Sequence, residues 1–282
     1  MRRTAAANWG VSSQMLKIWY ATVAERIALH GVSIWGVNVT INMQHALNSA
    51  QRPFLLGICR GFRTSPTTAL NVLARLPPLH LIVQSESVVV RVIRLKQDVT
   101  IWSKTYVSSD YENHISHSPC HPADFDIEAN CNPPSALQSL AVYTDGFKGE
   151  LGTGSAWCAM EDDHIIHSWA KKLHPSNSVF QAELTALKAA LDFTANNSRY
   201  KVIYTDSMLN LQAIQGDRSR HPIVRDIQKL LISITASLRP QLQWVPAHTG
   251  IKGNEAADMI AKGAANEPHV SSIGVPLPHS YL

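Results

Sequence analysis

The chain has 282 residues, enough for one large domain or two smaller ones that each bury a core. With 45% hydrophobic and 16% charged residues, its composition argues against a disordered chain and against a membrane protein. The net charge of +4 arises in the first half, because residues 1–135 carry 12 Lys/Arg and 8 Asp/Glu whereas residues 136–282 carry 13 of each. This weak basic bias is compatible with a polyanionic partner but does not require one.

The four cysteines form no Cys-x-x-Cys pair, which is typical of a protein from a reducing compartment. The amino terminus has no sustained apolar stretch of the kind found in a signal peptide, and no segment reaches the length of a membrane span. We therefore expect a soluble intracellular protein, in the nucleus or the cytoplasm, with no membrane partner.

The first half is predicted to be mostly helical. Apolar residues recur at helical spacing over residues 13–35, and a second helix is expected over residues 41–61. Thr64-Ser65-Pro66 has the pattern of a helix start, and Leu76-Pro77-Pro78 that of a helix end. We interpret residues 1–97 as one helical region.

Residues 98–135 are rich in Ser, Asn, His, Asp and Pro and show no periodic apolar face, so we interpret them as a linker. Five potential zinc ligands fall in this segment, but their spacing matches no standard zinc finger, so we interpret them as bystanders. They are His114, His117, Cys120, His121 and Cys131.

The second half has the pattern of an α/β domain over residues 136–270, followed by a tail at 271–282. Strands are expected at 140–144, 154–160, 165–173, 201–205 and 242–245, and helices at 181–196, between the last two strands, and at 254–265. This order predicts a mixed five-stranded sheet flanked by helices.

Two of these strands end in the same tripeptide, Tyr143-Thr144-Asp145 and Tyr204-Thr205-Asp206. If the strands are parallel neighbours, both acids meet at the carboxyl edge of the sheet, where α/β proteins bind ligands. Glu183, in the first turn of a helix, and Asp258, near the start of the last helix, can reach the same edge. Taken singly, each acid is better explained as a solvated strand end or helix cap; only the four acids together with their neighbouring residues favour a site.

Four converging carboxylates raise one another's pKa values unless a counter-cation compensates them. Ligand sets made only of oxygen favour Mg²⁺, with Mn²⁺ as a substitute. Phosphate chemistry commonly uses two such ions about 3.5–4 Å apart, one to activate the attacking water and one to stabilise the leaving 3′ oxygen. The products would carry 5′-phosphate and 3′-hydroxyl ends.

Four ordered blocks of the second half closely resemble the signature of type 1 ribonuclease H. They are Tyr143-Thr144-Asp145-Gly146, Gln181-Ala182-Glu183-Leu184, Tyr204-Thr205-Asp206-Ser207, and Ala247-His248-Thr249-Gly250 with Gly253-Asn254-Glu255-Ala256-Ala257-Asp258. The resemblance implies a ribonuclease H-like fold and an RNA–DNA hybrid as nucleic-acid partner, with the RNA recognised through its 2′-hydroxyls.

The same resemblance implies roles for individual residues. It makes Asp145, Glu183, Asp206 and Asp258 the catalytic metal ligands. It assigns to His248 a part in proton transfer or product release, which suits an imidazole that titrates near neutrality. Four further residues of these blocks are expected to bind substrate: Gly146, Gln181, Ser207 and Asn254. One departure is Phe147, where the family usually has Ser, and it changes the expected local contacts to substrate.

The first half resembles, more diffusely, the segment that joins reverse transcriptase to ribonuclease H in non-LTR retrotransposon polyproteins. The resemblance rests on Trp19–Gly36, Leu47–Arg63 with its Gln51-Arg52 pair, and Leu73–Leu79. The sequence contains no Tyr or Phe followed by x-Asp-Asp, the polymerase metal motif of that family. We therefore expect a carboxyl-terminal fragment without polymerase activity.

These observations favour an endonuclease that hydrolyses the RNA strand of RNA–DNA hybrids by two-metal catalysis. One alternative is a catalytically inactive nucleic-acid-binding remnant of a retrotransposon. Another is a helical interaction module in residues 1–97. A basic cluster is equally compatible with a track for a phosphate backbone and with a solvated helix face; it consists of Arg218, Arg220, Arg225 and Lys229.

Overall fold

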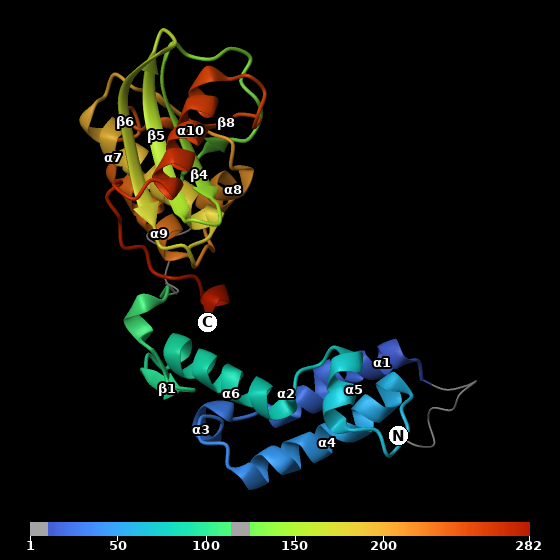
Figure 1. Cartoon of the computed structure of the whole chain (residues 1–282). Helices are drawn as coiled ribbons and strands as arrows, with labels where there is room; N and C mark the ends of the chain where they lie inside the picture. Colours follow the sequence, from blue (N-terminus) through green and yellow to red (C-terminus); the bar gives the residue numbers. More distant parts are fainter. Residues whose placement is uncertain (1–10, 114–124) are drawn as a thin grey trace. The chain divides into compact units, whose positions relative to one another are not determined.

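The computed structural model describes residues 11–113 and 125–282, and the chain divides into two compact units (Figure 1). The first unit comprises residues 1–109 with Leu282, and the second comprises residues 110–281. Of the five potential zinc ligands, only Cys131 lies in the described part of the chain; the other four lie outside it.

The first unit is helical, as the sequence predicts, but its first helix is broken. The expected helix over residues 13–35 is interrupted by a π-helical turn at Tyr20–Ala24 and by Gly31, whose φ of 63° only glycine adopts readily. The long helix α4 packs against α1, α5 and α6. The helices are α1 (Ser13–Trp19), α2 (Glu25–Ala28), α3 (Val32–Trp35), α4 (Ile41–Cys59), α5 (Thr67–Ala74) and α6 (Leu79–Val89).

Gln51 holds three of these elements together. Its side chain is 1% exposed, and its amide Nε2 donates to the hydroxyl of Tyr20 at 2.9 Å and to the carbonyl of Pro77 at 2.8 Å. Its Oε1 accepts from the backbone N–H of Leu79 at 3.0 Å, at the start of α6. Pro77 and Pro78 follow the end of α5 and directly precede α6. The sequence pattern at this point predicted the end of α5 but not the start of α6.

No single described helix is long and apolar enough to cross a membrane, although α5 and the segment Leu79–Arg94, bent by 62°, together reach that length and composition. A short hairpin of β1 (Val99–Ile101) and β2 (Lys104–Tyr106) follows, inside the expected linker. Its two turn residues, Trp102 and Ser103, both have positive φ angles.

The second unit contains a six-stranded mixed sheet with strand order β3-β8-β7-β4-β5-β6. Strands β4, β5 and β6 form an antiparallel meander, whereas β4, β7, β8 and β3 run parallel. The strands are β3 (Ala129–Asn130), β4 (Leu140–Lys148), β5 (Thr153–Glu161), β6 (His164–Leu173), β7 (Val202–Thr205) and β8 (Gln241–Trp244).

The five predicted strands are present, and β3 is an addition. It has two residues, too few for a periodic signal, and it lies in the segment expected to be a linker. Ile127, just before it, is 6% exposed and belongs to the main hydrophobic core of this unit. The sequence at 125–135 therefore folds with the sheet rather than connecting two domains.

Helices cover both faces of the sheet (Figure 1). On one face, α7 (Val179–Asn196), α8 (Met208–Gln215) and α9 (Pro222–Ser233) enclose the larger core, with Leu184, Ile203 and Ile227 at its centre. On the other face, α10 (Lys252–Asn266) lies against β4 and β5. This close packing requires Gly154, because a Cβ there would lie 2.1 Å from the carbonyl oxygen of Ala261.

The register between β4 and β7 fixes the level of the two Tyr-Thr-Asp ends. Tyr143 is paired with Tyr204 and Thr144 with Thr205, and the two tyrosine rings stack with centroids 5.0 Å apart. Asp145, still within β4, and Asp206, directly after β7, therefore lie at the same level of the sheet. This parallel pairing was the assumption on which the predicted carboxylate pair depended.

Residues 271–281, expected to be a tail, pack against the second unit as a C-terminal strap. Next to β6, the N–H of Ile273 donates to the carbonyl of Lys172 at 2.9 Å. Farther along, the N–H of Leu277 donates to the carbonyl of Asp110 at 2.7 Å, and its carbonyl accepts from the N–H of Glu112 at 3.0 Å. The strap thus joins residues from both ends of the unit.

Candidate active site

Three of the four predicted acids converge at the carboxyl edge of the parallel strands. One carboxylate oxygen from each of Asp145, Glu183 and Asp206 lies within 4.8 Å of the others. Asp145 is in β4 and is 8% exposed, Asp206 follows β7 directly, and Glu183 reaches the edge from the first turns of α7. Residues that are distant in sequence thus form one cluster of oxygen ligands.

Glu183 reaches this cluster because α7 approaches β4 very closely at Gly146. A Cβ at Gly146 would lie 2.4 Å from the backbone nitrogen of Glu183, so no other residue fits without moving the helix. The hydroxyl of Ser155 donates to the carbonyl of Ala182 at 2.6 Å and holds the same turn of the helix. Gly146, predicted to bind substrate, therefore has a positioning function in the structure.

Polar side chains hold two of the acids in place. Asn210, at 0% exposed, donates from Nδ2 to Oε2 of Glu183 at 3.1 Å, and the side chain of Ser207 also forms a hydrogen bond with Glu183. Asn254, at 3% exposed, donates from Nδ2 to Oδ2 of Asp206 at 3.0 Å. Both amide side chains are thereby committed to orienting a carboxylate.

The acid cluster carries negative charge that its surroundings compensate poorly. Burial and the charges of Asp206, Asp258 and Glu183 raise the pKa of Asp145 to about 8, although the backbone N–H of Gly146 opposes this by donating to Oδ1 at 2.6 Å. Burial, with a smaller contribution from Asp206, raises the pKa of Glu183 to about 7. A cation bound between these oxygens would remove this electrostatic penalty.

Asp258 is not one of the three converging acids. Its Oδ2 accepts from Nζ of Lys262, one helical turn later in α10, at 2.6 Å, although its charge still contributes to the raised pKa of Asp145. The same Nζ lies 5.7 Å from the ring centroid of Phe147, the residue that replaces the usual Ser of the resembling family. The ammonium group therefore occupies the space between Asp258 and the end of β4.

His248 and Gln181 have very different environments. His248 is exposed, in the loop before α10, with a left-handed φ of 54°. Gln181 is 1% exposed and forms a capping box with Ser178 at the start of α7. Its Nε2 donates to Glu112 and to the carbonyl of Pro276 at 2.9 Å. The amide of Gln181 is therefore used inside the protein, where it helps to hold the start of α7.

The basic cluster does not form one surface. Arg225 is 3% exposed and donates to Oε1 of Gln228 at 2.9 Å and to the carbonyl of Asp217 at 2.8 Å, whereas Arg218, Arg220 and Lys229 are exposed. Cys131, the one described potential zinc ligand, is partly buried, and its thiol contacts Oε1 of Gln215 at 3.5 Å.

Sequence reasoning missed two residues of the site. Asn210 lies outside the four recognised blocks, and its only signal is an amide at a buried position of a helix that also buries Leu211 and Ile214. Trp244, at the end of β8, donates from its indole N–H to the backbone carbonyl of Asp206 at 3.1 Å. No local pattern marks that contact, because it depends on the pairing of β8 with β7.

A mixed sheet with helices on both faces and a carboxylate cluster at the carboxyl edge defines an α/β enzyme domain. Residues 137–266 match the family described as RNase H, and this match supports a ribonuclease H enzyme in this part of the chain. The predicted enzyme class and fold class are thereby confirmed.

Bacterial proteins named ribonuclease H are similar to this part of the chain. The protein from Methylobacillus flagellatus is 29% identical over 143 residues, covering 45% of this chain and 92% of that protein. The protein from Tropheryma whipplei (strain Twist) is 26% identical over 151 residues, covering 49% and 92%. The crystal structure of RNase H1 from Halobacterium salinarum aligns with a TM-score of 0.34 and 22% identity, over 44% of this chain and 96% of that one.

Proposed function

We propose that the second unit hydrolyses the RNA strand of RNA–DNA hybrids in a reaction that depends on Mg²⁺ or Mn²⁺ and leaves 5′-phosphate and 3′-hydroxyl ends. The observation that carries this proposal is the convergence of Asp145, Glu183 and Asp206 within 4.8 Å at the sheet edge. Two relatives of this domain carry the name ribonuclease H, which supports the choice of substrate.

The donor chemistry of the site fits hard divalent cations. All the converging ligand atoms are carboxylate oxygens, the type that Mg²⁺ and Mn²⁺ prefer. The raised pKa values of Asp145 and Glu183 support a cation at the cluster, because a positive charge between these oxygens would stabilise their ionised forms. When bound, a pair of divalent ions supplies Lewis-acid activation of a water molecule and stabilisation of charge on the leaving oxygen.

The residues of the chain itself orient this cluster. Asn210 and Ser207 hold the carboxylate of Glu183, and Asn254 holds that of Asp206, so each acid presents a fixed oxygen to the shared centre. Such fixation matters because displacement of a catalytic group by even 1 Å slows a reaction severely. Ser207 and Asn254, which the sequence predicts as substrate contacts, form hydrogen bonds with the carboxylates of Glu183 and Asp206.

Asp258 and His248 are the two remaining residues of the proposed active site. Asp258 would act as a fourth ligand once it exchanges the Nζ of Lys262 for a cation. His248, exposed in its loop, is accessible to a substrate at the edge and supplies an imidazole for proton transfer or product release.

A cleavage assay tests the nuclease proposal. The full chain, incubated with a labelled RNA–DNA duplex and Mg²⁺, should cut the RNA strand, and EDTA or Asp206→Asn should abolish cutting. Asp163→Asn is the matched control, because it removes an exposed carboxylate that pairs with Lys252 on the surface and is not part of the acid cluster. Hybrid binding without metal-dependent cleavage would instead establish the catalytically inactive binding remnant.

The retrotransposon context is a separate proposal about the helical unit. The residues that carry the resemblance are those that organise its packing: Gln51 links three elements, and Arg52 donates to the carbonyls of Arg63 and Ser65 at 2.6 and 2.9 Å. The genomic DNA beside the coding region provides the test. Sequence encoding a reverse transcriptase there would support the proposal, and unrelated sequence on both sides would contradict it.

A further inference from the structure

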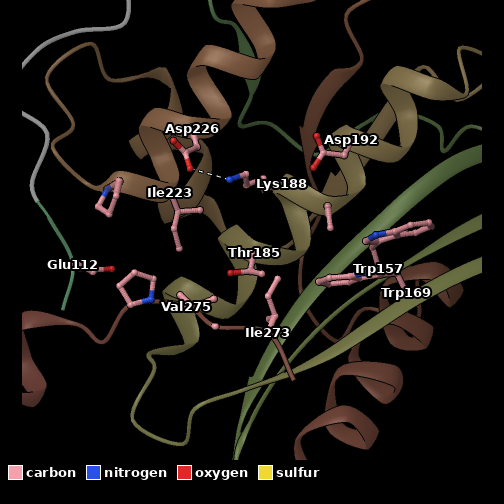
Figure 2. A pocket seen from close by; sticks show the side chains of 14 residues that line it. Glu112, Trp157, Trp169, Thr185, Lys188, Asp192, Ile223, Asp226, Ile273 and Val275 are labelled. Atoms are coloured by element: carbon pink, nitrogen blue, oxygen red, sulfur yellow. Dashed lines mark hydrogen bonds and ion pairs between the residues drawn. The ribbon is translucent and has the colours of Figure 1, made fainter. Parts of the chain in front are cut away.

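A pocket of about 520 Å³ lies in the second unit between α7, α9, the sheet and the C-terminal strap (Figure 2). None of the acids of the proposed active site lines it. Its volume is within the range of sites that hold small organic molecules. The pocket is therefore a candidate ligand site in its own right.

Its walls are largely apolar and come from separated parts of the chain. Trp157 on β5 and Trp169 on β6 are direct cross-strand partners, so both rings stand on the same face of the sheet. The strap segment Ile273–Pro276 and Ile223 of α9 contribute further apolar surface. This strap segment lies outside residues 137–266, so the pocket is not a feature of the family match alone.

The charged groups around the pocket are mainly acidic. Glu112, Asp192 and Asp226 line it together with a single ammonium group, that of Lys188. Lys188 is paired with Asp226 at 2.8 Å, and Glu112 accepts from Nε2 of His221 at 2.8 Å. The remaining acid, Asp192, lines the same pocket as the two tryptophans (Figure 2).

The carboxylate of Asp192 favours a cation in this pocket. Partial burial raises the pKa of Asp192, while the charge of Lys188 opposes this, so a second positive charge would stabilise the carboxylate. Tryptophan faces attract cations through the ring quadrupole. A phosphate or carboxylate ligand would meet three acids and one lysine, which excludes a nucleic-acid backbone from this pocket.

We propose that the pocket binds a small organic cation, an amine whose apolar body packs against Trp157 and Trp169 and whose ammonium group pairs with Asp192. Apolar contact supplies the affinity, and the charge selects the ligand. This proposal does not depend on nuclease activity, because no residue of the acid cluster takes part.

The test is a titration of the full chain with three probes of matched shape. 2-Phenylethylamine is the cation, 2-phenylethanol the neutral analogue and 3-phenylpropionate the anion, each followed by the indole N–H signals of protein labelled with ¹⁵N-tryptophan. The chain has seven tryptophans, so assignment of the signals locates the site. We expect the amine to shift the signals of Trp157 and Trp169 and to bind at least tenfold more tightly than either analogue.

Two variants test the same geometry. Asp192→Asn should weaken amine binding about tenfold, and Ala189→Phe, which places a ring in the pocket, should abolish it. Glu150→Gln, which removes an exposed acid that does not line the pocket, should leave binding unchanged. Equal binding of amine and alcohol, or an absence of shifts at Trp157 and Trp169 in the unmodified protein, would overturn the proposal whether or not the variants fold.

Discussion

Replacing Asp145 with Asn should stabilise the metal-free protein, and the gain should grow as the pH rises. In the folded state the pKa of Asp145 is raised from 3.8 to about 8, first by burial and then by the neighbouring acids. A carboxyl whose pKa is raised by folding binds its proton more tightly in the folded state, so stability falls as the pH rises from about 4 to about 8. Asn keeps the oxygen that accepts from Gly146 but never ionises.

The magnitude follows from the pKa of Asp145, since each tenfold change in proton affinity equals 1.36 kcal/mol. At pH 9 the unmodified protein carries the whole electrostatic penalty, at most about 6 kcal/mol, and at pH 6 about half of it. At pH 4 the penalty nearly vanishes because the carboxyl is neutral in the fold. The variant should therefore gain about 3 kcal/mol more at pH 9 than at pH 6.

Urea unfolding in EDTA measures this difference. Tryptophan fluorescence and circular dichroism should be followed at pH 6 and pH 9, with separate transitions fitted for the two units. Glu150→Gln controls for the loss of one negative charge at an exposed position. If Asp145→Asn stabilises the protein equally at both pH values, or destabilises it at pH 9, the electrostatic account of the acid cluster is wrong.

Three further variants probe how the cluster is held. Gly146→Ala should destabilise the protein by about 1–3 kcal/mol and weaken Mg²⁺ binding measured by calorimetry, because the added methyl group would collide with the backbone of Glu183. Unchanged Mg²⁺ binding would contradict this positioning role of Gly146. Asn210→Leu should lower the affinity for Mn²⁺ about fivefold to tenfold at nearly unchanged stability, because it removes the hydrogen bond to the carboxylate of Glu183. Equal losses of stability and of metal affinity would indicate that Asn210 is a merely structural residue. Lys262→Met should raise Mg²⁺ affinity roughly twofold to fivefold by freeing Asp258, and a lower affinity would refute this competition.

The acid cluster was predictable from sequence because its signal is repeated. The Tyr-Thr-Asp tripeptide occurs twice, inside β4 and at the end of β7, and its Tyr and Thr residues pair in register in the sheet. Local pattern and tertiary structure therefore agree at Asp145 and Asp206. The predicted strands and the long helix carrying Glu183 are present because each shows its own local signal, a short apolar run for the strands and a periodic apolar face for the helix.

The contacts that orient the acids were not predictable in this way. Asn210 and Trp244 act across elements that meet only in the folded chain, and the pairing of Asp258 with Lys262 competes with the proposed ligand role. A sequence pattern gives the type of residue at a position, but not which of two oppositely charged neighbours it will bind. For the same reason, Gln181 had the expected motif and a different role.

The predicted boundaries of helices and strands were wrong where an element is short or irregular. Strand β3 has only two residues, too few for a recognisable pattern. The helix expected over residues 13–35 contains a π-helical turn, which the 3.6-residue periodicity of an α-helix does not predict. The polar composition of residues 98–135 indicated a linker, yet Ile127 and the β1–β2 hairpin are ordered parts of the two units. A few buried apolar residues are enough to anchor a polar segment.

The C-terminal strap has a practical consequence for anyone who isolates the catalytic part of this chain. A fragment trimmed to the recognisable family segment would lack both Glu112 and Pro276, the two groups that accept hydrogen bonds from the buried amide of Gln181. That amide sits two positions before Glu183, so the excision would remove both acceptors that fix the helix turn carrying a proposed metal ligand. The smallest autonomous version of this enzyme must therefore begin near residue 110 and retain the last dozen residues.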